Sequence, residues 1–196
     1  MTMYPFVRRL SDLDAPVLPV TVKDAKSFMR LTHDRLDIEI YHSIRTAVQS
    51  LTMAIGRDLL STGWRLMLDH FPCGAAPIKI NRGPILTVEQ VTYIDPDGEH
   101  KTLLPDVDFT VIGLNDLDGT MLFPKLGKAW PVFIQHYTTI GVDFYSGFGT
   151  IPAEVPDPLR AAILYHVAHQ YMNMGDAAFS NEEYNATVRN YKVWAA

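Results

Sequence analysis

Two histidines three residues apart, His166 and His169, are the first side chains in this sequence whose type and spacing could do chemistry. On a helix they would share one side and could share a metal ion. No acidic residue stands between them in the pattern of a zinc protease, and no obvious third ligand lies nearby in the sequence. A small cytoplasmic metal-dependent enzyme or ligand-binding domain centred on this pair remains an alternative to the more common case, in which helix histidines are satisfied by their neighbours.

Two aspartate-rich segments, at residues 95–98 and 116–119, have the Asp-x-Asp-Gly beginning of a calcium loop. Such a loop needs a bidentate glutamate at its twelfth position, where this chain has Asp106 and Gly127. Asp, Asn, Pro and Gly are also the residues that tight turns favour. Both segments are therefore predicted to be hairpin turns.

The remaining candidates for catalysis lack the context that their chemistry needs. The segment 147–149, Gly-Phe-Gly, has neither the lysine nor the hydroxyl residue of a phosphate-binding loop. Ser61, Ser146 and Cys73 lie outside any nucleophile elbow, and the single cysteine excludes an intrachain disulfide. We therefore predict no catalytic residue, no metal site and no cofactor.

Composition narrows the class of protein further. The chain has 196 residues and a formal net charge of −5, which disfavours nucleic-acid binding through a basic face. No secretory signal follows Arg8 and Arg9, and no apolar run approaches the roughly 18 residues of a membrane span. We therefore expect a chain that does not bind membranes and that is cytoplasmic, or is assembled in the cytoplasm into something larger.

The elements that would position these residues follow from the spacing of apolar residues, which changes twice along the chain. Thr21 and Asp24 predict the start of a short helix, and Asp34 predicts the cap of a longer one that ends near Gly56. From Trp64 to about residue 150 the apolar residues recur with a period of two, in short runs separated by turns.

Helical periodicity then returns. Asp157 and Pro158 open a helix that is apolar nearly all round and ends at Gly175. Ser180 and Glu183 predict a capping box for a last helix. This last helix either closes the core or docks onto a partner.

The fold class is therefore α+β, a helical bundle with an inserted antiparallel β-sheet. We expect an N-terminal arm over residues 1–20 and a main domain over 21–176. Within that domain the helices fall at about 21–60 and 157–175, and the β insertion at about 62–150. Residues 177–196 would form a C-terminal docking helix.

Several segments resemble one family in their order and spacing. They are Gly-Arg-Asp-Leu-Leu-Ser-Thr-Gly-Trp at 56–64, Arg-Gly-Pro-Ile-Leu-Thr-Val at 82–88, Tyr-Ser-Gly-Phe-Gly at 145–149 and Val-Pro-Asp-Pro-Leu-Arg-Ala-Ala-Ile-Leu at 155–164. Together they resemble the phage head–tail connector proteins of the HK97 adaptor type, including the branch found in prophages and gene transfer agents. The resemblance runs from about Val20 to Gly175.

The resemblance implies a structural head-to-tail adaptor, not an enzyme. Such a protein forms a ring below the portal, joins head to tail in the particle neck, and lines the channel through which double-stranded DNA passes during ejection. Its partners would be the portal protein, the next tail component (stopper or tail terminator) and roughly eleven further copies of itself. About twelve chains of charge −5 would carry on the order of −60 charges, which would let DNA slide without sequence-specific binding.

Two groups of contact residues are predicted. The polar turns would touch ring neighbours or the tail through Asp95, Asp97, Gly98, Asn115, Asp118 and Gly119. The last helix would bind the portal through an aromatic stripe and its flanking cations, Tyr184, Val188, Arg189, Tyr191, Lys192 and Trp194.

Overall fold

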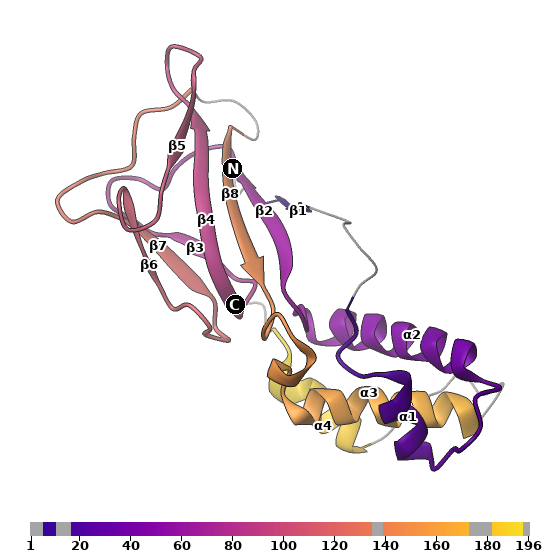
Figure 1. Ribbon diagram of the computed structural model, residues 1–196. Coiled ribbons are helices and arrows are strands. Elements are labelled where there is room, and N and C mark those ends of the chain that lie inside the picture. The colour runs from indigo at the N-terminus through magenta and orange to yellow at the C-terminus, as the bar shows by residue number, and fades with distance from the viewer. Residues whose placement is uncertain (1–5, 11–16, 135–138, 173–181, 194–196) are drawn as a thin grey trace. The chain divides into compact units, whose positions relative to one another are not determined.

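The computed structural model describes residues 6–10, 17–134, 139–172 and 182–193. The chain folds into two compact units, each made from two separate stretches of sequence (Figure 1). We call them the β unit, Met1–Asp14 with Ser61–Gly147, and the helical unit, Ala15–Leu60 with Phe148–Ala196. The α+β class predicted from the change of hydrophobic period is confirmed.

The helical unit packs its helices around one apolar core. Its elements are α1 (Val22–Met29), α2 (Asp37–Ile55), a 3₁₀ turn (Pro152–Glu154), α3 (Asp157–Met172) and α4 (Glu182–Tyr191). One apolar stripe of α2 is buried, since Ile40, Ile44, Ala47, Leu51 and Ile55 all belong to this core. Leu159, Ala162, Ile163 and Val167 of α3 belong to it as well, so the helices that flank the β segment in sequence share one core.

The start of α1 and the end of α2 follow the capping signals in the sequence, whereas the start of α2 does not. Thr21 and Asp24 form the capping box of α1, and Gly56 ends α2 with a φ of 71°. Asp34 does not cap α2. The cap position is Leu36, and Asp34 pairs with Lys26 instead. Asp157 lies in the first turn of α3 rather than before it, where it pairs with Arg160 at 3.3 Å.

The β unit is a sandwich of two antiparallel sheets. The five-stranded sheet has the order β1 (Phe6–Arg9), β2 (Thr62–Leu68), β8 (Ile140–Ser146), β4 (Ile85–Ile94) and β5 (His100–Leu103). The three-stranded sheet has the order β3 (Ile78–Ile80), β7 (Thr120–Pro124) and β6 (Phe109–Ile112). The last described strand of the chain, β8, begins at Ile140.

The register of the five-stranded sheet explains its alternating residues. Leu66 on β2, Val142 on β8 and Val91 on β4 stand in one row and are buried in the sandwich core. The neighbouring row contains Arg65 and Asp143, so polar residues gather on the opposite face. A strand within the expected irregular arm is an unpredicted addition, because β1 extends this sheet by pairing with β2.

Candidate functional site

The turn between β4 and β5 is held by its own first aspartate. The carboxylate of Asp95 accepts the backbone N–H groups of Asp97 and Glu99 at 3.0 and 2.9 Å. The hydrogen bond from Glu99 is the main reason that the pKa of Asp95 lies below its usual value, and Lys101 at 3.5 Å adds to the effect. Asp97, Gly98 and Glu99 remain exposed, so the turn is a fixed scaffold that presents a polar tip.

The second predicted contact segment, Asn115 to Gly119, is packed against its own unit. The N–H of Asn115 donates to the carbonyl of Ile85 at 2.8 Å. Gly119 has a φ of 102°, and a Cβ there would lie 2.5 Å from the carbonyl oxygen of Ile80. The exposed side chains of Asn115 and Asp118 therefore stand on a segment that is docked onto the chain between β3 and β4.

The structure does not bring the two predicted contact segments together. Asn115 bonds to Ile85 at the start of β4, whereas Asp95 follows its last residue, Ile94. A strand of 10 residues separates these points, roughly 30 Å by the usual rise per residue. The two segments therefore form separate candidate contact sites, one at each end of β4.

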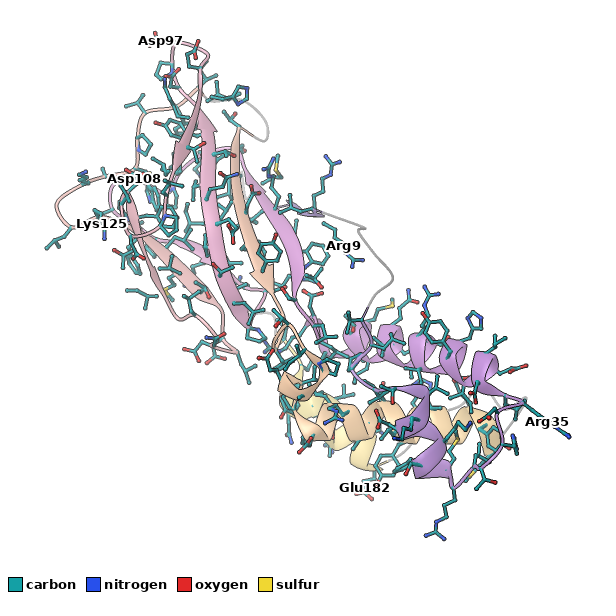
Figure 2. All side chains as sticks on the ribbon, viewed as in Figure 1. Arg9, Arg35, Asp97, Asp108, Lys125 and Glu182 are labelled. Carbon is teal, nitrogen blue, oxygen red and sulfur yellow. The ribbon has the colours of Figure 1, made fainter. Side chains whose placement is uncertain are left out.

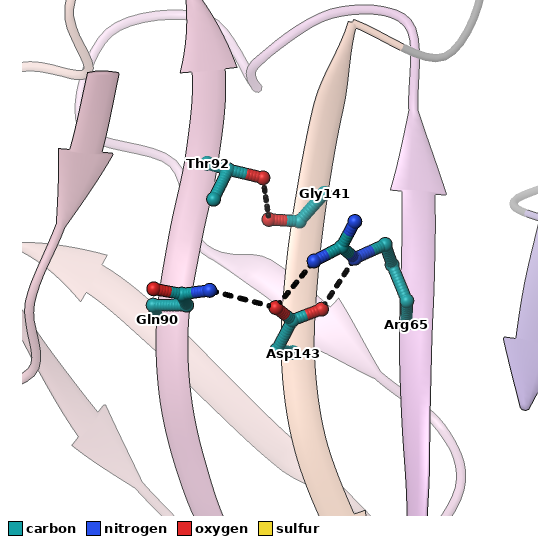
Figure 3. A network of polar contacts seen from close by, with 5 residues as sticks. All are labelled: Arg65, Gln90, Thr92, Gly141 and Asp143. Atoms are coloured by element: carbon teal, nitrogen blue, oxygen red, sulfur yellow. Dashed lines mark hydrogen bonds and ion pairs between the residues drawn. The ribbon is translucent and has the colours of Figure 1, made fainter. Parts of the chain in front are cut away.

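The polar face of the five-stranded sheet carries a network that sequence reasoning missed (Figure 3). Arg65 on β2 donates to both carboxylate oxygens of Asp143 on β8, from Nε at 2.5 Å and from Nη2 at 2.6 Å. Gln90 on β4 donates to the same carboxylate at 2.9 Å. Gly141 leaves room for this arrangement, because a Cβ there would lie 3.2 Å from Cδ of Arg65.

The network keeps a buried carboxylate ionised. Burial alone would raise the pKa of Asp143, but the hydrogen bonds from Arg65 and Gln90 outweigh burial and hold it below its usual value. A signal for this network existed in the sequence. Asp143 lies in an otherwise apolar strand, and a buried acid needs a cation on a neighbouring strand.

The aromatic stripe of α4 packs against the helical core. Tyr184, Val188 and Tyr191 contact that core and are only partly exposed. The rings of Tyr191 and Phe148 meet edge to face with centroids 5.8 Å apart. Nε of the buried Arg57 donates to the carbonyl of Tyr191 at 2.5 Å.

The side of α4 that faces solvent carries the flanking cations. Arg189 and Lys192 are both exposed. Trp194, the other aromatic residue of the predicted portal contact, lies outside the described residues, as do Gly175 and Ser180, where sequence signals placed the helix ends. The described part of the C-terminal segment thus has a packed aromatic side and a cationic outer side.

The histidine pair of α3 sits beside α4. The ring of His166 meets that of Tyr184 with centroids 6.0 Å apart, and its Nε2 lies 3.3 Å from the amide nitrogen of Gln170. Burial, and secondarily the charge of His169, lowers the pKa of His166. Within the described parts of the chain no three His, Cys, Asp or Glu side chains gather as metal ligands. His166 is thus a part-buried residue that packs on Tyr184.

Comparison with known proteins identifies the fold. No family model matches the sequence, and no curated protein is significantly similar to it. Solved structures do match. A chain in the neck of an empty gene transfer agent particle, computed with C6 symmetry, superposes with a TM-score of 0.76 at 17% identity and covers 97% of both chains.

The fold is similar to that of gene transfer agent neck chains. A chain from the native particle's neck, computed with C12 symmetry, gives a TM-score of 0.72 at 19% identity and covers 97% of both chains. A chain of the native virion gives 0.74 at 18% identity and covers 97% of this chain and 96% of that one. At these identities the likeness establishes the fold, and the match includes both units. No helix among the described residues combines the length and apolar character that crossing a bilayer requires.

Proposed function

We propose that this protein is a structural component of the neck of a gene transfer agent or tailed-phage particle, where it acts as a head-to-tail adaptor. The observation that carries the proposal is a match over 97% of the chain to neck proteins, which extends over the helical and β units alike. A shared fold by itself permits many functions. Here three matched chains all come from gene transfer agent particles, which favours an assembly role over the alternative enzyme.

We propose further that copies of this chain form a ring. Copies of one chain that repeat around an axis need a heterologous interface that closes, and about twelve copies would match the expected portal. The polar tip at Asp97 and Gly98 and the docked segment at Asn115 and Asp118 would contact neighbours or the next tail component, since both present polar groups on a rigid scaffold. The net charge of −5 per chain would keep DNA mobile in the channel.

Contact with the portal would use the solvent side of α4. Its aromatic residues Tyr184, Val188 and Tyr191 would hold the helix on the bundle, and Arg189 and Lys192 would reach acidic groups of the portal. Trp194 follows these residues in sequence and remains part of the proposed contact. Rim charges of this kind set association rate and salt dependence more than stability.

Electron microscopy of the purified chain, alone and mixed with a portal protein from the same source, tests the proposal. We expect rings that stack on the portal. A chain that stays monomeric at all concentrations and does not bind the portal would show that the adaptor role is wrong. Stoichiometric zinc in the purified protein, lost from a His166→Gln/His169→Gln variant, would favour the metal-dependent alternative.

A further inference from the structure

The five-stranded sheet of the β unit ends in two open edges. β1 lies at one end of the strand order and β5 at the other, and no described strand pairs with the outer side of either. These edges differ in charge. We call Arg8, Arg9 and Leu10 the basic edge, and Leu104, Asp106 and Val107, which follow β5, the acidic edge.

On the basic edge, Arg8 has no carboxylate in its own row of the sheet that is left to neutralise it. Arg8 on β1 stands directly opposite Arg65 on β2, and like charges in this position repel. The one carboxylate in that row, Asp143, is already bound at both oxygens by Arg65. Among the described residues Arg8 forms no ion pair, and it is exposed. Leu10 beside it is 41% exposed.

The acidic edge is a rigid turn that points its side chains outward. The carboxylate of Asp108 accepts the N–H of Leu104 at 2.9 Å, and the N–H of Asp106 donates to the carbonyl of Phe109 at 2.9 Å. Asp106 has a φ of 63°, which aspartate tolerates better than most residues. Its carboxylate is exposed and has no cation partner among the described residues. Val107 is 64% exposed and Leu104 is 49% exposed.

The two edges lie at the same level of the sheet. Val7, Leu66, Val142, Val91 and Leu103 form one continuous cross-strand row. Each neighbouring pair in the order is antiparallel, so the first and fifth strands run in the same direction. The residues after Val7 and those after Leu103 therefore extend toward the same end of the sheet. Figure 2 shows Arg9 and Asp108 on opposite sides of the β unit.

We propose that the basic edge of one copy docks against the acidic edge of the next, so that the β units join head to tail around the ring. This inference rests on the proposed ring-forming function and assigns the partner of the interface, a second copy of this chain. The basic edge offers the exposed Leu10 beside Arg8 and Arg9, and the acidic edge offers the exposed Leu104 and Val107 beside Asp106, so the named charges of the two edges are complementary. An interface between unlike patches of the same chain is the kind that closes into a ring.

Charge reversal at either edge tests this assignment. In the double variant Arg8→Glu/Arg9→Glu both edges are acidic. In the double variant Asp106→Asn/Val107→Lys both edges are basic, and asparagine keeps a residue that tolerates the positive φ. Lys79→Glu, an exposed residue of the other sheet, is the matched control. Ring formation is measured by sedimentation and by negative-stain microscopy, and urea unfolding checks that each variant is folded.

We expect wild type and the Lys79→Glu control to form rings, and each edge variant alone to lose them. A one-to-one mixture of the two edge variants should form rings again, because each acidic edge then meets a basic one. Rings from either variant alone at the wild-type concentration, or no recovery of rings on mixing, would overturn the edge assignment. The proposed function would still stand in that case, as long as the wild type forms rings. A wild type that forms no ring, alone or on the portal, overturns both.

A second measurement serves if an edge variant does not fold. Leu10→Cys and Val107→Cys are introduced together in a Cys73→Ser background, since Cys73 is exposed and free. Mild oxidation should yield a ladder of linked chains up to the full ring, and either cysteine alone should yield at most dimers. Oxidised rings that remain single chains on a denaturing gel contradict the proposed contact.

Discussion

The two units of this protein use their charged residues differently. The helical unit has 9 Lys and Arg against 10 Asp and Glu, and several of these are paired within the unit, as Lys26 is with Asp34 and Asp37. The β unit has 8 against 12, a net charge of −4. Two of its acidic turn residues, Asp97 and Asp106, are exposed and form no ion pair among the described residues.

This contrast indicates a division of roles. Exposed ion pairs add little stability, so unpaired surface charges cost the β unit little and remain available to a partner. The helical unit instead uses polar groups to fix its own packing, as Arg57 does when it donates to the carbonyl of Tyr191. The following changes test whether the helical unit is a closed scaffold and the β unit a surface for display.

The largest effect is expected from removing α4. Truncation after Asp176 would expose the core surface now covered by Tyr184, Val188 and Tyr191, and would remove the carbonyl that accepts from Nε of the buried Arg57. The free energy of unfolding, measured in urea, should fall by at least about 3 kcal/mol. The matched variant Arg189→Ser/Lys192→Ser keeps the packing and should weaken portal binding with unchanged stability. An equally stable truncated chain would mean that α4 is only a docking element.

The two turns of the β unit should respond differently to one added methyl group. Gly119→Ala places a Cβ against the carbonyl of Ile80 at a φ of 102°, so the free energy of unfolding should fall by about 3 kcal/mol. Gly98→Ala meets nothing within 4 Å and suffers only its φ of 87°, so about 1 kcal/mol is expected. Thermal melts of both variants measure the difference. Equal losses would contradict the distinction between a docked segment and a free tip.

A smaller loss of stability is expected when the network around Asp143 on the five-stranded sheet is broken. Asp143→Ala removes the acceptor of Arg65 and Gln90, but Arg65 is 35% exposed and can turn to water, so about 1–2 kcal/mol is expected. Asp143→Asn should retain part of this stability. Because the folded-state pKa of Asp143 is lowered, its contribution is present above pH 3.8 and is lost as pH falls through the folded value. Identical acid unfolding of wild type and Asp143→Asn would contradict this.

The smallest effect concerns His166. Its folded-state pKa lies below 6.5 because of burial, so the unfolded chain binds a proton more readily and stability falls as pH drops below about 6.5. His166→Gln should flatten the pH dependence of unfolding between neutral pH and pH 5, and His169→Gln should change it less. Urea titrations at several pH values measure the slope. If the pH dependence of unfolding is unchanged in His166→Gln, the idea that His166 is buried by its packing against α4 is wrong.

Local signals in the sequence predicted much of this fold, and non-local pairings account for what they missed. The capping box at Thr21 and the change of period at Trp64 depend on neighbouring residues, and both appear in the structure. β1 has only 4 residues and pairs with β2 across a long stretch of sequence, so no pattern near Phe6 predicts this strand. Arg57 lies just after the end of α2, but the carbonyl that accepts from its Nε belongs to Tyr191, 134 residues away.

The candidate contact residues show the same limit. The Asp-x-Asp-Gly spacing predicted two turns, and turns are present at Asp95 and after Gly113. The spacing could not show that the segment at Asn115 packs on the strand that begins at Ile85. It also could not show that Arg8 faces Arg65, because this cross-strand pair joins residues that α1 and α2 separate in the sequence.

The interleaved path of the chain has a consequence for synthesis on the ribosome. β1 emerges early, but its partner β2 lies beyond the first two helices, and the centre of the sheet waits for β8. α1 and α2 likewise cannot bury their apolar sides until α3 arrives. Neither unit can close from the first half of the chain, so both finish folding late in translation. Nascent chains would therefore expose no finished ring interface, and subunits would join only after release.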